Sequence, residues 1–85
     1  MSNRNAEISE SIDSLVNAWC DRRCLVALRQ ILNGYPIASP LTDGWGELRL
    51  SLEKVRAFAR HEVTEDEIAR INRLIGELNM MLDNR

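Results

Sequence analysis

The chain has 85 residues, of which 45% are hydrophobic and 28% are charged, and its formal net charge is −2. A chain of this length folds as a single domain around one modest core, with little room for a cofactor cavity. Because the net charge is negative, no overall positive field would attract nucleic acid or an anionic membrane surface.

The first 14 residues are polar and acidic, and they lack the basic region and apolar stretch of a secretory signal. This pattern favours a cytoplasmic protein. The longest apolar run covers residues 25–28, far short of the roughly 20 residues that cross a bilayer. We therefore expect no membrane-spanning segment.

Residues 5–32 are predicted to form one long amphipathic helix. Its end is expected at Asn33 and Gly34, which can adopt the left-handed conformation that closes a helix, and Pro36 cannot continue one. The pattern leaves open whether the helix is continuous or breaks in residues 20–23. When the chain is wound at about 100° per residue, one stripe contains the following apolar residues: Ile8, Ile12, Leu15, Val16, Trp19 and Val26.

The segment of residues 33–43 is the one long connection, because it holds both prolines. Tyr35, Ile37 and Leu41 provide apolar anchors, so we expect this loop to lie across the end of the bundle. A second helix is predicted over residues 44–61. Its inward face is expected to consist of Trp45, Leu48, Leu52, Val55 and Ala59.

A third helix is predicted over residues 65–83, with the clearest start signal in the chain. The Thr64 hydroxyl is expected to accept a hydrogen bond from the backbone N–H of Glu67, and the Glu67 carboxylate from that of Thr64. Val63 and Ile68 match the hydrophobic staple that often flanks such a capping box. Several local signals therefore agree on where this helix begins.

Together these elements predict an all-α protein with a single domain over residues 1–85. Its expected architecture is a three-helix bundle with a long first helix, a Pro-containing loop and a C-terminal antiparallel helical hairpin. The hairpin is inferred from the short link, residues 62–64, between the second and third helices.

Two cysteines are the main candidates for chemistry. Cys20 and Cys24 lie four residues apart, on adjacent turns of one helix face, where two thiolates can begin a metal site. Tetrahedral zinc needs further ligands, and the single histidine, His61, lies at the far end of another helix. We interpret the cysteines as buried reduced thiols, with a metal site between two chains and a disulfide as alternatives. No nucleophile has a recognisable base, so we expect no enzymatic activity, no cofactor and no metal.

A helix-turn-helix interpretation would insert the N-terminal turn of the 65–83 helix into the DNA major groove. That turn carries Glu65, Asp66 and Glu67, whose carboxylates would repel phosphates. Nucleic acid is therefore not an expected partner. Arg70 is expected to pair with Glu67 on the helix surface.

Beyond Cys20, the predicted first helix is apolar on nearly every side, which two partner helices and one loop can hardly cover. Either the loop from Tyr35 to Leu41 folds over this end, or a second copy covers it through a two-fold interface. We favour a homodimer. The residues predicted to form the dimer or partner interface are Leu25, Leu28, Arg29, Leu32 and Tyr35.

The function that fits these observations is a non-enzymatic protein–protein interaction module, with self-association favoured and another protein as a second possible partner. One alternative is a small acidic inhibitor or immunity-type binder, whose acids at Asp43, Glu47 and residues 65–67 would steer it to a basic target. The other alternative is a DNA-associated regulator.

Overall fold

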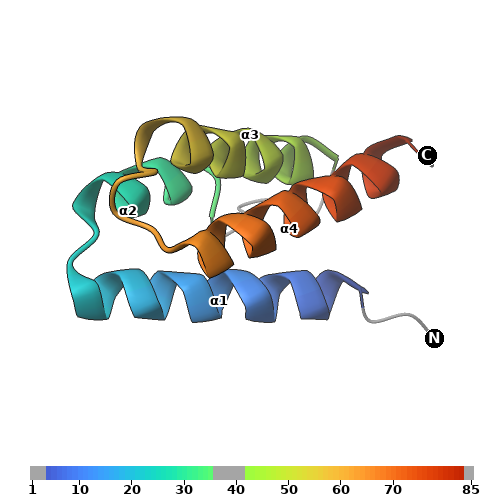
Figure 1. Ribbon diagram of the computed structural model, residues 1–85. Coiled ribbons are helices and arrows are strands. Elements are labelled where there is room, and N and C mark those ends of the chain that lie inside the picture. The colour runs from blue at the N-terminus through green and yellow to red at the C-terminus, as the bar shows by residue number, and fades with distance from the viewer. Residues whose placement is uncertain (1–3, 36–41, 84–85) are drawn as a thin grey trace.

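The computed structural model describes residues 4–35 and 42–83, and within these ranges the chain is all-helical, with four helices and no strand (Figure 1). The all-α prediction is confirmed. The last helix has the bounds predicted for it, whereas α3 begins and ends earlier than the expected range 44–61. The helices are α1 (Arg4–Arg22), α2 (Leu25–Ile31), α3 (Thr42–Phe58) and α4 (Glu65–Asp83).

The predicted single helix over residues 5–32 is wrong, because the chain turns between α1 and α2. Arg23 is left-handed, with φ 58°. Its N–H bonds to the carbonyl of Cys20 at 3.2 Å, and the N–H of Cys24 bonds to the carbonyl of Trp19 at 2.8 Å. These two bonds form a Schellman motif, which ends α1 although no glycine occupies the left-handed position. Because the apolar stripe continues across the turn, periodicity alone does not reveal it.

The end of α2 also differs from expectation. Neither Asn33 nor Gly34 has a positive φ, so no left-handed residue closes this helix. Short turns do so instead, with N–H groups of these two residues bonded to carbonyls three positions earlier. Gly34 serves a different purpose: a Cβ atom there would lie 2.5 Å from both the Glu47 carbonyl oxygen and the Ser51 hydroxyl. A glycine is required because α3 passes so close.

The helices surround a single core. α3 and α4 run side by side in opposite directions, while α2 packs against both α1 and α3 (Figure 1). All four helices contribute side chains with no exposed surface, so α2 belongs to the core as much as the longer helices do. The fully buried residues are Ile12, Trp19, Ala27, Ile31, Leu48, Leu52, Val55, Ala59, Ile71 and Leu78.

Parts of the predicted connection lie outside the described residues, including both prolines and the expected anchors Ile37 and Leu41. Tyr35 is described and is half-buried. The expectation that this loop lies across the end of the bundle therefore stays a prediction.

In the ranges that the structure covers, no helix combines the length and apolar character needed to cross a bilayer.

Candidate functional site

The outer face of α2 carries most of the predicted interface. Leu25, Leu28, Arg29 and Leu32 follow the spacing i, i+3, i+4 and i+7, which places them on one side of a helix. Leu25 is 66% exposed and Leu32 is 55% exposed. Between them, Arg29 is exposed, whereas Leu28 is partly buried against the core. The structure therefore brings these four residues together on a single face.

Tyr35 does not belong to that face. Its hydroxyl donates a hydrogen bond to the Asp13 carboxylate and lies 3.5 Å from the Ser9 carbonyl oxygen, both on α1. Burial, together with the hydrogen bond to Asp13 and its negative charge, raises the pKa of Tyr35 to about 12. The side chain thus ties the segment after α2 back to α1, where its hydroxyl is already engaged.

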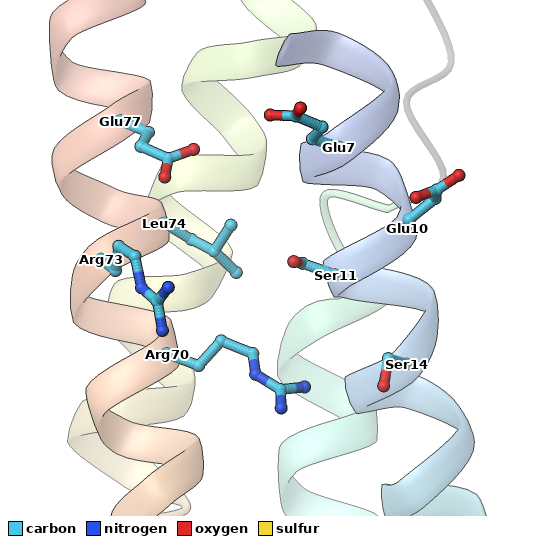
Figure 2. Close-up of a pocket in the computed structure, with 8 residues that line it drawn as sticks. All are labelled: Glu7, Glu10, Ser11, Ser14, Arg70, Arg73, Leu74 and Glu77. Atoms are coloured by element: carbon cyan, nitrogen blue, oxygen red, sulfur yellow. The ribbon is translucent and has the colours of Figure 1, made fainter. Parts of the chain in front are cut away.

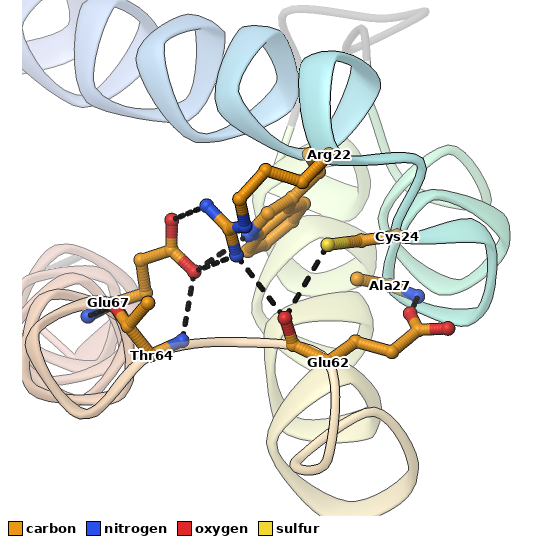
Figure 3. A network of polar contacts seen from close by, with 7 residues as sticks. Arg22, Cys24, Ala27, Glu62, Thr64 and Glu67 are labelled. Carbon is orange, nitrogen blue, oxygen red and sulfur yellow. Dashed lines mark hydrogen bonds and ion pairs between the residues drawn. The ribbon is translucent and has the colours of Figure 1, made fainter.

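The N-terminus of α2 is capped by a residue far away in the sequence. Cys24, at the N-cap position, makes no side-chain capping bond. Instead, the Glu62 carboxylate accepts a hydrogen bond from the N–H group of Ala27 at 2.9 Å (Figure 3). It accepts a second from the N–H group of Val26 at 3.3 Å. The Cys24 thiol donates to the Glu62 carbonyl at 3.3 Å. A helix of seven residues gains little stability by itself, so these contacts help to hold α2 in place.

A second acidic residue, Glu67, joins α1 to the start of α4. Its carboxylate accepts two hydrogen bonds of 2.8 Å from Arg22 and one of 3.1 Å from the Trp19 indole (Figure 3). It also accepts from the Thr64 N–H at 3.0 Å, while the Glu67 N–H donates to the Thr64 hydroxyl at the same distance. The predicted capping box is therefore confirmed, and α1 is bonded to it.

These contacts change the acidity of the carboxyl group. The Arg22 hydrogen bonds, helped by those from Thr64 and Trp19, lower the pKa of Glu67 to about 2, although burial opposes the shift. The same bonds raise the pKa of Arg22 further above its usual range. Glu67 thus stays charged in an almost fully buried position, 9% exposed. The expected pairing of Glu67 with Arg70 is wrong, because Arg22 from α1 occupies the carboxylate.

Arg22 also donates to the Glu62 carbonyl at 3.1 Å, so the two networks meet at this side chain. No pattern in the sequence predicts these roles of Arg22 and Glu62. The capping-box pattern reveals only the local half of the Glu67 contacts. The other half joins residues more than 40 positions apart, and no spacing rule addresses such a pair.

A groove of about 570 Å³ lies between α1 and α4 (Figure 2). Buried Leu74 contributes to its lining, and acidic and basic side chains face it from the two helices. No ion pair is formed among these charges, including the neighbours Arg73 and Glu77. The remaining lining residues are Glu7, Glu10, Ser11, Ser14 and Arg70.

Both cysteines are free thiols, with Cys24 buried and Cys20 exposed, so the expectation of burial is right for one of them. His61 is exposed in the turn after α3, 4.0 Å from the Glu62 carboxylate. Within residues 4–35 and 42–83, no three His, Cys, Asp or Glu side chains are grouped closely enough to hold a metal ion.

With this geometry, the chain was compared with known proteins. No family model, curated protein or solved structure matches it. In its described residues, the fold and surface define a small all-helical protein with an exposed apolar face on a short, firmly anchored helix.

Proposed function

We propose that the protein is a non-enzymatic protein–protein interaction module that acts through the outer face of α2. The observation that carries this proposal is the exposure of Leu25 and Leu32, 66% and 55%, on the same side of one helix. Fully burying a leucine side chain contributes roughly 1.5–3 kcal/mol. A partner that covers both leucines would gain this energy.

The way α2 is held supports the proposal. The inner side of the helix is buried through Ala27 and Ile31, and its N-terminus is bonded to Glu62. A partner would meet a face that is already ordered, so binding would cost little conformational entropy. Pre-organised anchors of this kind favour specific association.

The first form of this proposal is a homodimer, as the sequence favours. In a two-fold dimer with the two α2 helices antiparallel, Leu25 of each copy would lie opposite Leu32 of the other. Such an arrangement would cover both exposed leucines. The predicted hairpin and dimer together would make a compact helical assembly.

Light scattering at tens of micromolar tests self-association through this face. If the homodimer forms, its measured mass is twice that of the chain, and either Leu25→Arg or Leu32→Glu returns it to that of a monomer, because each places a charge in an apolar contact. Met80→Arg is the control, since Met80 is 55% exposed on α4, outside the face. A monomeric wild-type protein at these concentrations would exclude the homodimer.

The two alternatives from the sequence have separate tests. A small acidic binder would use Glu65 and Asp66, exposed in the first turn of α4, and its affinity would fall as salt rises. Glu67 would contribute little, because Arg22 already pairs with it. A DNA-associated regulator predicts duplex binding at physiological salt in a gel shift, against which these same two acids argue.

A further inference from the structure

The exposed face of α2 extends towards Phe58, the last residue of α3, which is 59% exposed. Gly34, after α2, contacts α3 at Ser51, and Glu62 caps the start of α2. The two helices therefore run antiparallel, with the start of α2 near the end of α3. Phe58 lies seven positions after Ser51, on the same stripe of α3. Phe58 therefore stands at the end of α3 that is nearer to the first turn of α2, which carries Leu25.

The charges around these apolar side chains are mainly positive. Arg29 is exposed between Leu25 and Leu32, and α2 contains no acidic residue. Lys54, four positions before Phe58, is exposed one turn away on the same side of α3. Further exposed basic residues stand where α2 begins and α3 ends, whereas the accompanying acids are Asp21 and the capping Glu62 at that end and Glu47 at the other. These basic residues are Arg23, Arg60 and His61, the last positive when protonated.

A second copy fits this region less well than an acidic partner does. A stable interface buries roughly 800 Å² on each partner, whereas a helix of seven residues is only about 10 Å long. The contact must therefore extend over Phe58 and the surrounding cations. A two-fold axis near Leu28 would also bring Arg29 close to its own copy, and like charges across an interface disfavour association.

From this arrangement, and resting on the proposed function, we infer that the face formed by Leu25, Leu32 and Phe58 binds an acidic amphipathic helix of another protein. Its apolar residues would cover the two leucines and the phenylalanine, in the manner of a helix docked along an apolar surface. Its Asp and Glu residues would pair with Arg29 and Lys54. The cations then set the specificity, and the apolar residues provide most of the affinity.

Two labelled helical peptides test this inference by fluorescence anisotropy. They carry the same leucines at i, i+3 and i+7, with glutamates on the flanks of one and lysines on the flanks of the other. At about 50 mM salt, the acidic peptide is expected to bind at least about tenfold more tightly than the basic one. At about 500 mM salt the difference should shrink, because exposed ion pairs are screened.

Variants assign the binding to this face. The double reversal Arg29→Glu/Lys54→Glu should invert the preference between the two peptides, and Leu25→Ser should weaken both. Arg70→Glu/Arg73→Glu is the matched double reversal in the groove between α1 and α4, and it should leave the preference unchanged. Circular dichroism checks that each variant remains folded.

Several outcomes would overturn the inference. These are equal affinity for the two peptides, an acidic-peptide affinity unaffected by the double reversal, or tighter binding to duplex DNA or phosphatidylserine vesicles than to the acidic peptide. A dimer that Leu25→Arg dissociates, with no peptide binding, would overturn it while supporting the proposed function. A monomer that binds neither peptide would count against both.

Discussion

The two sides of α2 differ in how much they contribute to the stability of this short helix. On the inner side and at its N-terminus, Ala27 and Ile31 are fully buried and Glu62 caps the first turn. On the outer side, Leu25 and Leu32 remain mostly exposed. The inner contacts hold the helix in place, and under the proposed function the outer leucines serve association. Variants on the inner side should therefore change stability, and variants on the outer side should change binding.

The largest expected effect comes from protonating Glu67 with acid, which breaks its contacts with Arg22 and Trp19 near the start of α2. Because the folded-state pKa of Glu67, about 2, lies below the ordinary 4.5, its charge stabilises the fold above about pH 4.5. The difference corresponds to roughly 3 kcal/mol, lost as the pH falls from about 4.5 to 2. Denaturant unfolding across this range should show the loss in the wild type.

Glu67→Gln should remove most of that pH dependence and be less stable than the wild type at neutral pH. Glu65→Gln is the matched control, because Glu65 is exposed in the same helical turn and should leave the acid-dependent loss in place. An unchanged pH profile of stability in Glu67→Gln would contradict the stabilising role of the Glu67 charge.

The next largest effect comes from disturbing the close contact between Gly34, after α2, and α3. Gly34→Ala would place a Cβ atom 2.5 Å from the Glu47 carbonyl oxygen, which belongs to the α3 backbone and cannot rotate away. We expect a loss of about 2 kcal/mol in the free energy of unfolding. Gly76→Ala is the control: no atom lies within 4 Å of the new Cβ in α4, so it should gain about 0.5–1 kcal/mol.

A smaller effect is expected from changing Arg23 in the turn between α1 and α2. Arg23 adopts φ 58°, a conformation that costs a residue with a side chain roughly 1 kcal/mol relative to glycine. Arg23→Gly should therefore raise the free energy of unfolding by about 1 kcal/mol, which thermal denaturation would show as a higher midpoint. Arg29→Gly, within α2, should lower stability by a similar amount. If both substitutions destabilise equally, Arg23 is not the strained position.

Each element could be predicted to the extent that its signals were local. The start of α4 follows from Thr64 and Glu67, because a capping box is complete within four residues. The bounds of that helix agree with the prediction. The sequence left open a break in residues 20–23 and did not decide it, because the hydrogen bonds of the turn at Arg23 join backbone groups, and an arginine in place of glycine offers no signal.

For the candidate site, the sequence predicted an interface at Leu25, Leu28, Arg29 and Leu32, since apolar excess is visible in composition. The structure places these residues on one face of α2, and their role in an interface stays a prediction. Tyr35, predicted as part of the same interface, instead has its hydroxyl bonded to α1. The sequence did not indicate Phe58, because the register between α2 and α3 depends on Gly34 and Glu62, contacts between distant segments.

By itself, the sequence determined the all-helical class and the α4 boundaries. It also showed that the segment after Cys20 is apolar on nearly every side. Only the tertiary structure decided that the chain turns at Arg23, that Arg22 pairs with Glu67, and that Leu25 and Leu32 face outward. The reason is physical. Helix propensity and capping act within a few residues, whereas a side chain's exposure depends on which distant segments pack against it.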